Sequence, residues 1–118
     1  MATGRLLIIA PDDDLRRSLA FALEAEGYAI AAYARIADAP EPEGYDCTVL
    51  DHRATSGSAN DVLEFCRHAR PVVLLAGTPL PWLDGHVFRV VQKPLLGEPL
   101  SRAVRDALTS SGKNSSPK

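Results

Sequence analysis

The feature that most constrains the fold is a short apolar run that ends on a carboxylate, Asp46–Asp51. Thr48, Val49 and Leu50 favour a β-strand, and no Gly or Pro interrupts them. A strand without polar alternation is typical of a parallel sheet whose two faces are covered by helices. Asp51 would then lie at the carboxyl edge of the sheet, where open α/β sheets bind their ligands. A carboxylate in that place costs free energy unless another group compensates its charge.

The rest of the chain alternates strand-like and helix-like segments. We expect strands at Arg5–Ala10, Tyr28–Tyr33, Asp46–Asp51, Pro71–Ala76 and Val87–Gln92. Three-residue and four-residue apolar spacing predicts a helix from Asp12 to about Gly27, one from Ser58 or Asn60 to Ala69, and one from Pro99 to Leu108. Prolines limit residues 34–44 to one or two helical turns and exclude a long helix over Gly77–Gly85. This order predicts an α/β fold, a doubly wound five-stranded parallel sheet of the flavodoxin type, with strand order 2-1-3-4-5 and shortened second and fourth helices.

Composition narrows the class of protein. The 118 residues predict one domain, over residues 5–109, followed by a flexible polar tail, 110–118. Thirteen basic and fifteen acidic residues give a net charge of −2 without a basic stripe, which argues against a nucleic-acid partner. No apolar run reaches the length of a membrane span and no signal peptide is visible, so we expect a cytoplasmic protein with no membrane contact. Cys47 and Cys66 form no C-x-x-C pair, and we interpret them as buried free thiols.

The ends of strands one, three, four and five share one edge of such a sheet. That edge would bring together Asp12 or Asp13, Asp51, Ala76 and Lys93. A lysine near Asp51 supplies the charge partner that the carboxylate needs. An aspartate nucleophile, a divalent ion held by carboxylates and a lysine that binds a phosphoryl oxygen are together suited to accept a phosphoryl group.

With these residues the chain resembles bacterial response-regulator receiver domains (CheY-like) over about residues 5 to 109. The similarity is carried by RLLII with the acidic cluster and LRRSLAFALEAEGY after it, by YDCTVLD, by PVVLLAG and by VVQKPLLGEPLSRAV. The resemblance implies a signalling domain of a two-component phosphorelay and not an enzyme, with Asp51 as phospho-acceptor and Lys93 in contact with the phosphate. It implies Mg²⁺ held by Asp12, Asp13 and Asp51. The implied partners are a sensor histidine kinase or a phosphotransfer protein, bound through the face from strand four to the last helix, and a homodimer is compatible with it. Because the chain ends just after the last helix, we expect a stand-alone receiver.

Several positions depart from the family pattern. Ala10 and Pro11 stand where the family has its acidic metal-binding pair, and only a slipped register would restore Asp12 and Asp13 to that role. Ala76 replaces the usual Thr or Ser at the end of strand four, although Thr78 follows two residues later and is our candidate replacement for binding the phosphoryl group. Val90 stands where the family has a switching Tyr or Phe. These losses weaken the expectation of Mg²⁺.

Two other classes of function remain open. One is a pseudo-receiver, a protein-binding module that works without phosphorylation, in which Asp51 and Lys93 form a structural ion pair. The other is a flavodoxin-like enzyme or nucleotide-binding protein, which the absence of a Gly-rich loop after the first strand disfavours.

Single residues in this region also allow two interpretations. Asp12, Asp13 and Asp14 either bind metal or cap a helix. His52 is either an acid/base or phosphoryl carrier, or a solvated loop residue. Trp82 is either an exposed interface anchor or a cover for core that a missing helix leaves open, and we favour the second.

Overall fold

The computed structural model describes residues 4–55, 58–69, 71–77, 80–83, 85–92 and 98–110, with the side chains of residues 98 and 110 not described. Five parallel strands form one sheet: β1 Arg5–Ile9, β2 Ala29–Tyr33, β3 Cys47–Asp51, β4 Val72–Ala76 and β5 Arg89–Gln92. Their order is β2-β1-β3-β4-β5. The predicted flavodoxin-like and CheY-like fold class is therefore confirmed.

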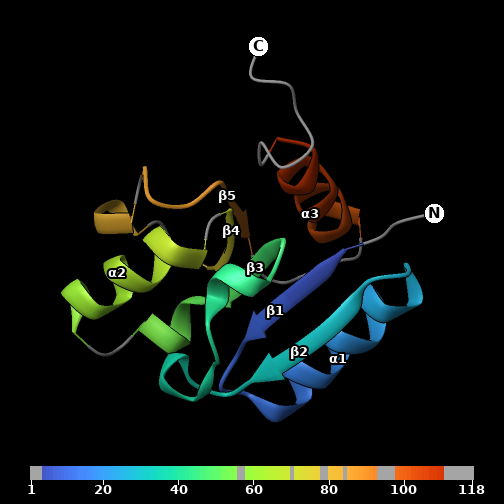
Figure 1. Ribbon diagram of the computed structural model, residues 1–118, viewed down its shortest axis with the longest axis horizontal. Coiled ribbons are helices and arrows are strands. Elements are labelled where there is room, and N and C mark those ends of the chain that lie inside the picture. Colours follow the sequence, from blue (N-terminus) through green and yellow to red (C-terminus); the bar gives the residue numbers. More distant parts are fainter. Residues whose placement is uncertain are drawn as a thin grey trace.

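Helices cover both faces of the sheet (Figure 1). Helices α1, Asp13–Ala25, and α3, Glu98–Ser110, pack on one face, and α2, Ala59–Ala69, packs on the other. Alternate residues of the central strands serve the two faces, so that Leu6 and Ile8 join the α1/α3 core while Leu7 and Ile9 join the α2 core. The strands β1, β3 and β4 are fully buried or nearly so from their second residue onward, as unbroken apolar runs predict.

Helix α1 has well-defined ends. The side chain of Asp12 accepts a hydrogen bond from the backbone N–H of Leu15 (2.9 Å), which caps the first turn. At the other end Gly27 has φ 107°, and its N–H donates to the carbonyl of Glu24 while that of Tyr28 donates to the carbonyl of Leu23. This is a Schellman motif, and it confirms the predicted stop at Gly27. It also turns the chain directly into β2.

The other two helices follow the predicted patterns. The carbonyl of Ser58 accepts a hydrogen bond from the N–H of Val62 (3.1 Å), which places the start of α2 at the predicted residue. Phe65 joins the buried side of α2, a position that the sequence interpretation did not include. Helix α3 buries the predicted stripe, with Leu100, Ala103, Val104 and Ala107 all in the core. It extends to Ser110, the first residue of the predicted tail, and the rest of that tail, residues 111–118, lies outside the described residues.

The connections contain short 3₁₀ turns. Residues 34–46 hold two of them, Ile36–Asp38 and Pro42–Gly44, in agreement with the predicted lack of a long helix. His52–Thr55 also forms a 3₁₀ turn, closed by a hydrogen bond from the Thr55 hydroxyl to the His52 carbonyl (2.5 Å). In the described part of residues 77–85 the only helical element is the turn Pro81–Leu83.

Leu83, and not Trp82, is the residue of the turn Pro81–Leu83 that covers the core. Leu83 is fully buried in the α2 core, whereas 38% of the Trp82 surface is exposed. The interpretation that Trp82 covers the core is therefore wrong. The register of the short turn directs Leu83 inward, and the larger side chain is left at the surface.

Within the part of the chain that the structure describes, none of the helices combines the length and the apolar character needed to span a bilayer.

Candidate functional site at the carboxyl edge of the sheet

Asp51 is the last residue of β3 and lies at the edge of the sheet where the strands end. Its side chain is 0% exposed, and both carboxylate oxygens are buried. The strand register pairs Asp51 with Leu75 on β4. The sequence therefore predicted the position of this carboxylate correctly, but not the completeness of its burial.

The neighbouring strand ends bring apolar residues to Asp51. Ile9 on β1 pairs with Leu50 on β3, so the next residues along the two strands are Ala10 and Asp51. Ala10 is fully buried, and Pro11 follows it. At the end of β4, Ala76 is also buried. The register therefore places Ala10, and not an acidic residue, beside Asp51, and the alternative slipped register is not adopted.

Asp12 lies two residues beyond Ala10, and its two carboxylate oxygens make different contacts. One carboxylate oxygen caps α1, and the other lies 3.6 Å from a guanidinium nitrogen of Arg53. Arg53 belongs to the 3₁₀ turn that follows Asp51. The contact between Asp12 and Arg53 therefore joins the loop after β1 to the loop after β3.

Asp13 forms an ion pair with Arg16 one turn along α1. Arg16 also donates a hydrogen bond to the carbonyl of Ala10 (2.8 Å) and makes a longer one to the carbonyl of Pro11 (3.4 Å). Its side chain is only 22% exposed. The guanidinium of Arg16 therefore lies at the end of β1, next to the strand that carries Asp51.

His52 lies against Asp51 at the same edge. Its ring nitrogen Nδ1 is 3.4 Å from a carboxylate oxygen of Asp51 and 3.3 Å from the carbonyl oxygen of Leu75. The side chain is half-buried. His52 therefore contacts the strand ends while its side chain stays 35% exposed, because the 3₁₀ turn folds the ring back onto them.

The acids of this edge do not fit a metal ion well. Among residues 4–55, 58–69, 71–77, 80–83, 85–92 and 98–110, no group of three or more His, Cys, Asp or Glu side chains is arranged to hold a metal. Asp12 and Asp13, the predicted ligands beside Asp51, are engaged by Arg53 and Arg16. Mg²⁺ would require several oxygen ligands in octahedral geometry. The predicted set of Asp12, Asp13 and Asp51 stays a prediction, and the arginine contacts of Asp12 and Asp13 argue against it.

Two predicted site residues lie outside the described residues, Lys93 and Thr78. The strand β5 ends at Gln92, which pairs with Ala76. The roles given to Lys93 and Thr78 stay predictions.

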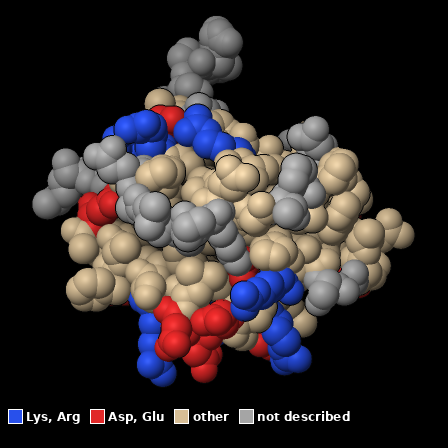
Figure 2. Space-filling model, turned by 180° about the vertical axis from the view of Figure 1, so that it is seen from behind, with Lys and Arg blue, Asp and Glu red and all other residues tan. Residues whose placement is uncertain are grey.

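Charged side chains gather where these loops lie. Figure 2 shows acidic and basic side chains next to one another along the lower edge of the molecule, which is the edge where α1 begins in Figure 1. This edge therefore carries mixed charge and not a continuous acidic surface.

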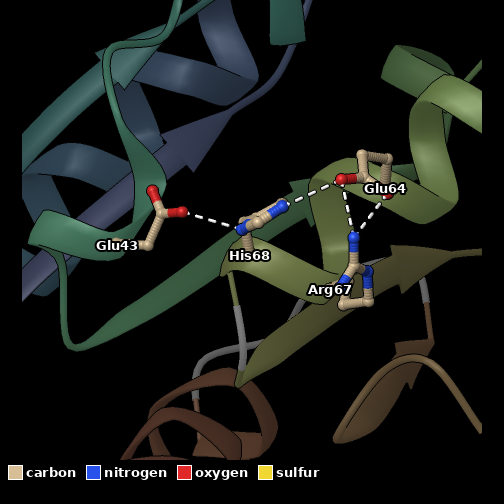
Figure 3. A network of polar contacts seen from close by, with 4 residues as sticks. All are labelled: Glu43, Glu64, Arg67 and His68. Carbon is tan, nitrogen blue, oxygen red and sulfur yellow. Dashed lines mark hydrogen bonds and ion pairs between the residues drawn. The ribbon is translucent and has the colours of Figure 1, made fainter.

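A second polar cluster connects the loop after β2 to α2 (Figure 3). His68 lies between two carboxylates, with Nδ1 2.8 Å from Glu43 and Nε2 2.9 Å from Glu64. Arg67 donates to both oxygens of Glu64, and these hydrogen bonds, with a smaller effect from His68, lower the pKa of Glu64. Glu43 belongs to the turn Pro42–Gly44, so the cluster fastens this turn to the last turn of α2. It has no strand-end carboxylate and takes the role of a structural tether.

Comparison with known proteins places this geometry in a structural class. No protein-family model matches the sequence, and no curated protein matches it. Solved structures do match. The chain is similar to a CheY-like response regulator receiver domain protein from Methanospirillum hungatei JF-1, with a TM-score of 0.78 and 18% identity over 97% of this chain and 100% of that chain.

Two further solved structures agree. A response regulator receiver domain protein from Clostridium thermocellum matches with a TM-score of 0.70 and 16% identity, over 92% of this chain and 96% of that chain. Full-length FixJ from B. japonicum matches with a TM-score of 0.72 and 17% identity, over 93% of this chain but 60% of that chain. The chain thus has the fold of CheY-like receiver domains.

The sequence interpretation missed Arg16 and Arg53. Arg16 lies mostly off the apolar stripe of α1, so the stripe gives no sign of its contacts at the end of β1. The signal that would have found it is its spacing of three residues from Asp13, which places the two side chains on one side of the helix. The pair of Arg53 with Asp12 spans 41 residues of sequence, and nothing local predicts it.

Proposed function

We propose that this chain is a receiver-type signalling domain that acts through contacts with protein partners and not through Mg²⁺-dependent phosphorylation of Asp51. The observation that carries the proposal is the complete burial of the Asp51 carboxylate at an edge where Ala10 and Ala76 are its strand-end neighbours. The receiver fold supports the signalling role and gives no reason to expect an enzyme.

The chemistry of phosphoryl transfer supports the proposal. A carboxylate nucleophile must reach phosphorus in line, and the charge that builds up on the transferred group must be stabilised by cations held in place beforehand. Both oxygens of Asp51 are buried. The nearby carboxylates that would hold a divalent ion, Asp12 and Asp13, already face arginines. Transfer to Asp51 would therefore require the edge to open and the ion pairs to separate first.

A partner-binding surface is available near β5. Val90 on β5 is 48% exposed, and Phe88 just before the strand and Trp82 in the turn after β4 are exposed as well. Large apolar side chains that stay in contact with water favour protein interfaces. We place the partner contact on the face from β4 to α3, and a sensor histidine kinase or a phosphotransfer protein is the class of partner that the receiver fold suggests.

The alternative is a working receiver with Asp51 as phospho-acceptor and Lys93 as its phosphate-binding lysine. The position of Asp51 at the carboxyl end of β3 favours it, because this is where ligand chemistry occurs in doubly wound sheets.

Intact mass spectrometry separates the two proposals. The protein is incubated with a small-molecule phosphodonor, with and without Mg²⁺, beside an Asp51→Asn control. We expect no phosphoryl adduct in any sample. An adduct that requires both Mg²⁺ and Asp51 would overturn the proposal and restore the phospho-acceptor function.

A further inference from the structure

Two arginines hold the acids at the edge of the sheet. Arg16 pairs with Asp13 and at the same time donates to the carbonyl oxygen at the end of β1. Arg53 pairs with Asp12 across the two loops. The two arginines come from different elements, α1 and the turn after β3, and both reach the acids that flank the start of α1.

The charges of Asp12 and Asp13 are each matched by an arginine. Asp12 and Asp13 contribute two negative charges, and Arg53 and Arg16 contribute two positive charges, each within ion-pair distance of its partner. A divalent cation that approached the two acids would meet two guanidinium groups and would have to displace them. Arginine is protonated throughout the pH range in which proteins fold, so this positive charge is always present.

The two arginines differ in their exposure to solvent and in their other contacts. Arg16 donates to the carbonyl oxygen of Ala10, the residue after β1, while most of the arginine side chain is covered by protein. The Arg53 side chain is more exposed, at 57%. It pairs with the carboxylate oxygen of Asp12 that does not cap α1. The arrangement therefore places one covered and one exposed cation around the two carboxylates.

We propose that Arg16 and Arg53 take the place of a divalent cation at this edge, so that Asp12 and Asp13 are neutralised from within the chain and the edge has no metal site. This deepens the proposed function, which holds that the domain works without Mg²⁺. Arg16 and Arg53 are positioning residues here. Their removal takes away the positive charge that faces these two carboxylates and leaves both open to a metal ion.

The test uses Mn²⁺ as a probe and follows the broadening of backbone amide signals by NMR. We expect no saturable site near α1 in the wild-type protein. In the double variant Arg16→Gln/Arg53→Gln we expect localised, saturable broadening around residues 12 and 13, at Mn²⁺ concentrations on the order of tenfold below those that broaden these signals in the wild type. Added Mg²⁺ should also raise the melting temperature of the double variant and leave that of the wild type unchanged.

Three further variants make the test specific. Arg17→Gln removes the same charge from an exposed position on α1 and should produce no gain in Mn²⁺ affinity. The double variant with Asp12→Asn added should lose the gained site. If the double variant does not fold, Arg53→Gln alone, at an exposed position, should give a smaller gain of the same sign.

Three results would overturn the proposal. One is a saturable Mn²⁺ site in the wild-type protein that Asp12→Asn abolishes. Another is a variant without Arg16 and Arg53, or without Arg53 alone, that binds Mn²⁺ no better than the wild type. The third is an equal gain in Arg17→Gln, which would assign the effect to net charge. A Mn²⁺ site in the wild-type protein without a phosphoryl adduct would overturn this inference alone. An adduct that requires Mg²⁺ and Asp51 would overturn the proposed function.

Discussion

Thr48 and Asp51 are the two fully buried polar side chains of β3, and their surroundings differ. Asp51 lies at the strand end within reach of His52. Thr48 lies in the middle of the sheet, paired with Leu7 and Val72. Its hydroxyl has no hydrogen-bond partner among the residues that the structure describes. A buried hydroxyl without a partner loses its hydrogen bonds to water and gains none in exchange.

Thr48→Val should therefore stabilise the protein. Valine keeps the branched shape and removes the hydroxyl, so we expect the free energy of unfolding to rise by about 1 kcal/mol. Urea unfolding followed by circular dichroism measures the change. The matched control is Thr55→Val, which should destabilise the protein because the Thr55 hydroxyl donates to the carbonyl of His52. A loss of stability in Thr48→Val as large as that in Thr55→Val would contradict this account.

Among the elements, the short turn Pro81–Leu83 shows how one buried side chain can replace part of a helix. Prolines prevent a long helix between β4 and β5, and the α2 core below would otherwise lack a cover. The Leu83 side chain is fully buried in the α2 core, whereas the Trp82 side chain remains partly exposed to solvent. The backbone N–H of Leu83 donates to the carbonyl of Leu80 (2.9 Å), which fixes the turn.

Leu83→Ala and Trp82→Ala should consequently have different effects. We expect Leu83→Ala to lower the free energy of unfolding by about 2–4 kcal/mol, because it leaves a cavity in the α2 core. Trp82→Ala should cost less than half as much, since its side chain remains partly in water. Chemical denaturation of the two variants under the same conditions makes the comparison. A larger loss for Trp82→Ala would return Trp82 to the role of core cover.

The elements were predictable from sequence where the pattern is local. Unbroken apolar runs gave β1, β3 and β4, and the three- and four-residue spacing gave α1 and the buried stripe of α3. Gly27 predicted the end of α1 because its positive φ suits a glycine. The choice between Trp82 and Leu83 was not predictable, because it depends on the direction of a turn only three residues long.

The site was predictable only in part, for the same reason. Asp51, Ala10 and Ala76 follow from strand ends and parallel register, which the sequence carries. The contact of Arg53 with Asp12 depends on how two loops meet, and the fold of His52 onto Asp51 depends on a 3₁₀ turn that the polar sequence does not signal. Long-range pairs between loops require the structure.

Over the whole molecule, burial of the two free thiols links stability to alkaline pH. Burial raises the pKa of Cys47 from its ordinary value of 9.0 to about 12 and that of Cys66 to about 11. Because the unfolded chain loses these protons at lower pH than the folded protein, the stabilising effect is complete below about pH 9 and is lost as the pH rises toward 11 and 12.

The free energy of unfolding should accordingly fall between about pH 9 and about pH 11. In the Cys47→Ala/Cys66→Ala variant the slope should be smaller, with a remainder from Tyr28, whose pKa is also raised chiefly by burial. Urea unfolding at a series of pH values, with each variant referred to its own stability near neutral pH, measures the slope. An unchanged slope in the double variant would show that the thiols do not control it.

The central claim of this account is that the folded protein closes Asp51 off from solvent. Carbodiimide coupling of an amine to carboxylates, mapped by peptide mass spectrometry, tests it directly. Asp14, an exposed residue at the start of α1, provides an internal reference within the same chain. We predict rapid labelling of Asp14 and no labelling of Asp51 in the folded protein, with both labelled in urea. Labelling of Asp51 in the folded protein at the rate of Asp14 would contradict the account and would make the carboxylate available for phosphoryl transfer.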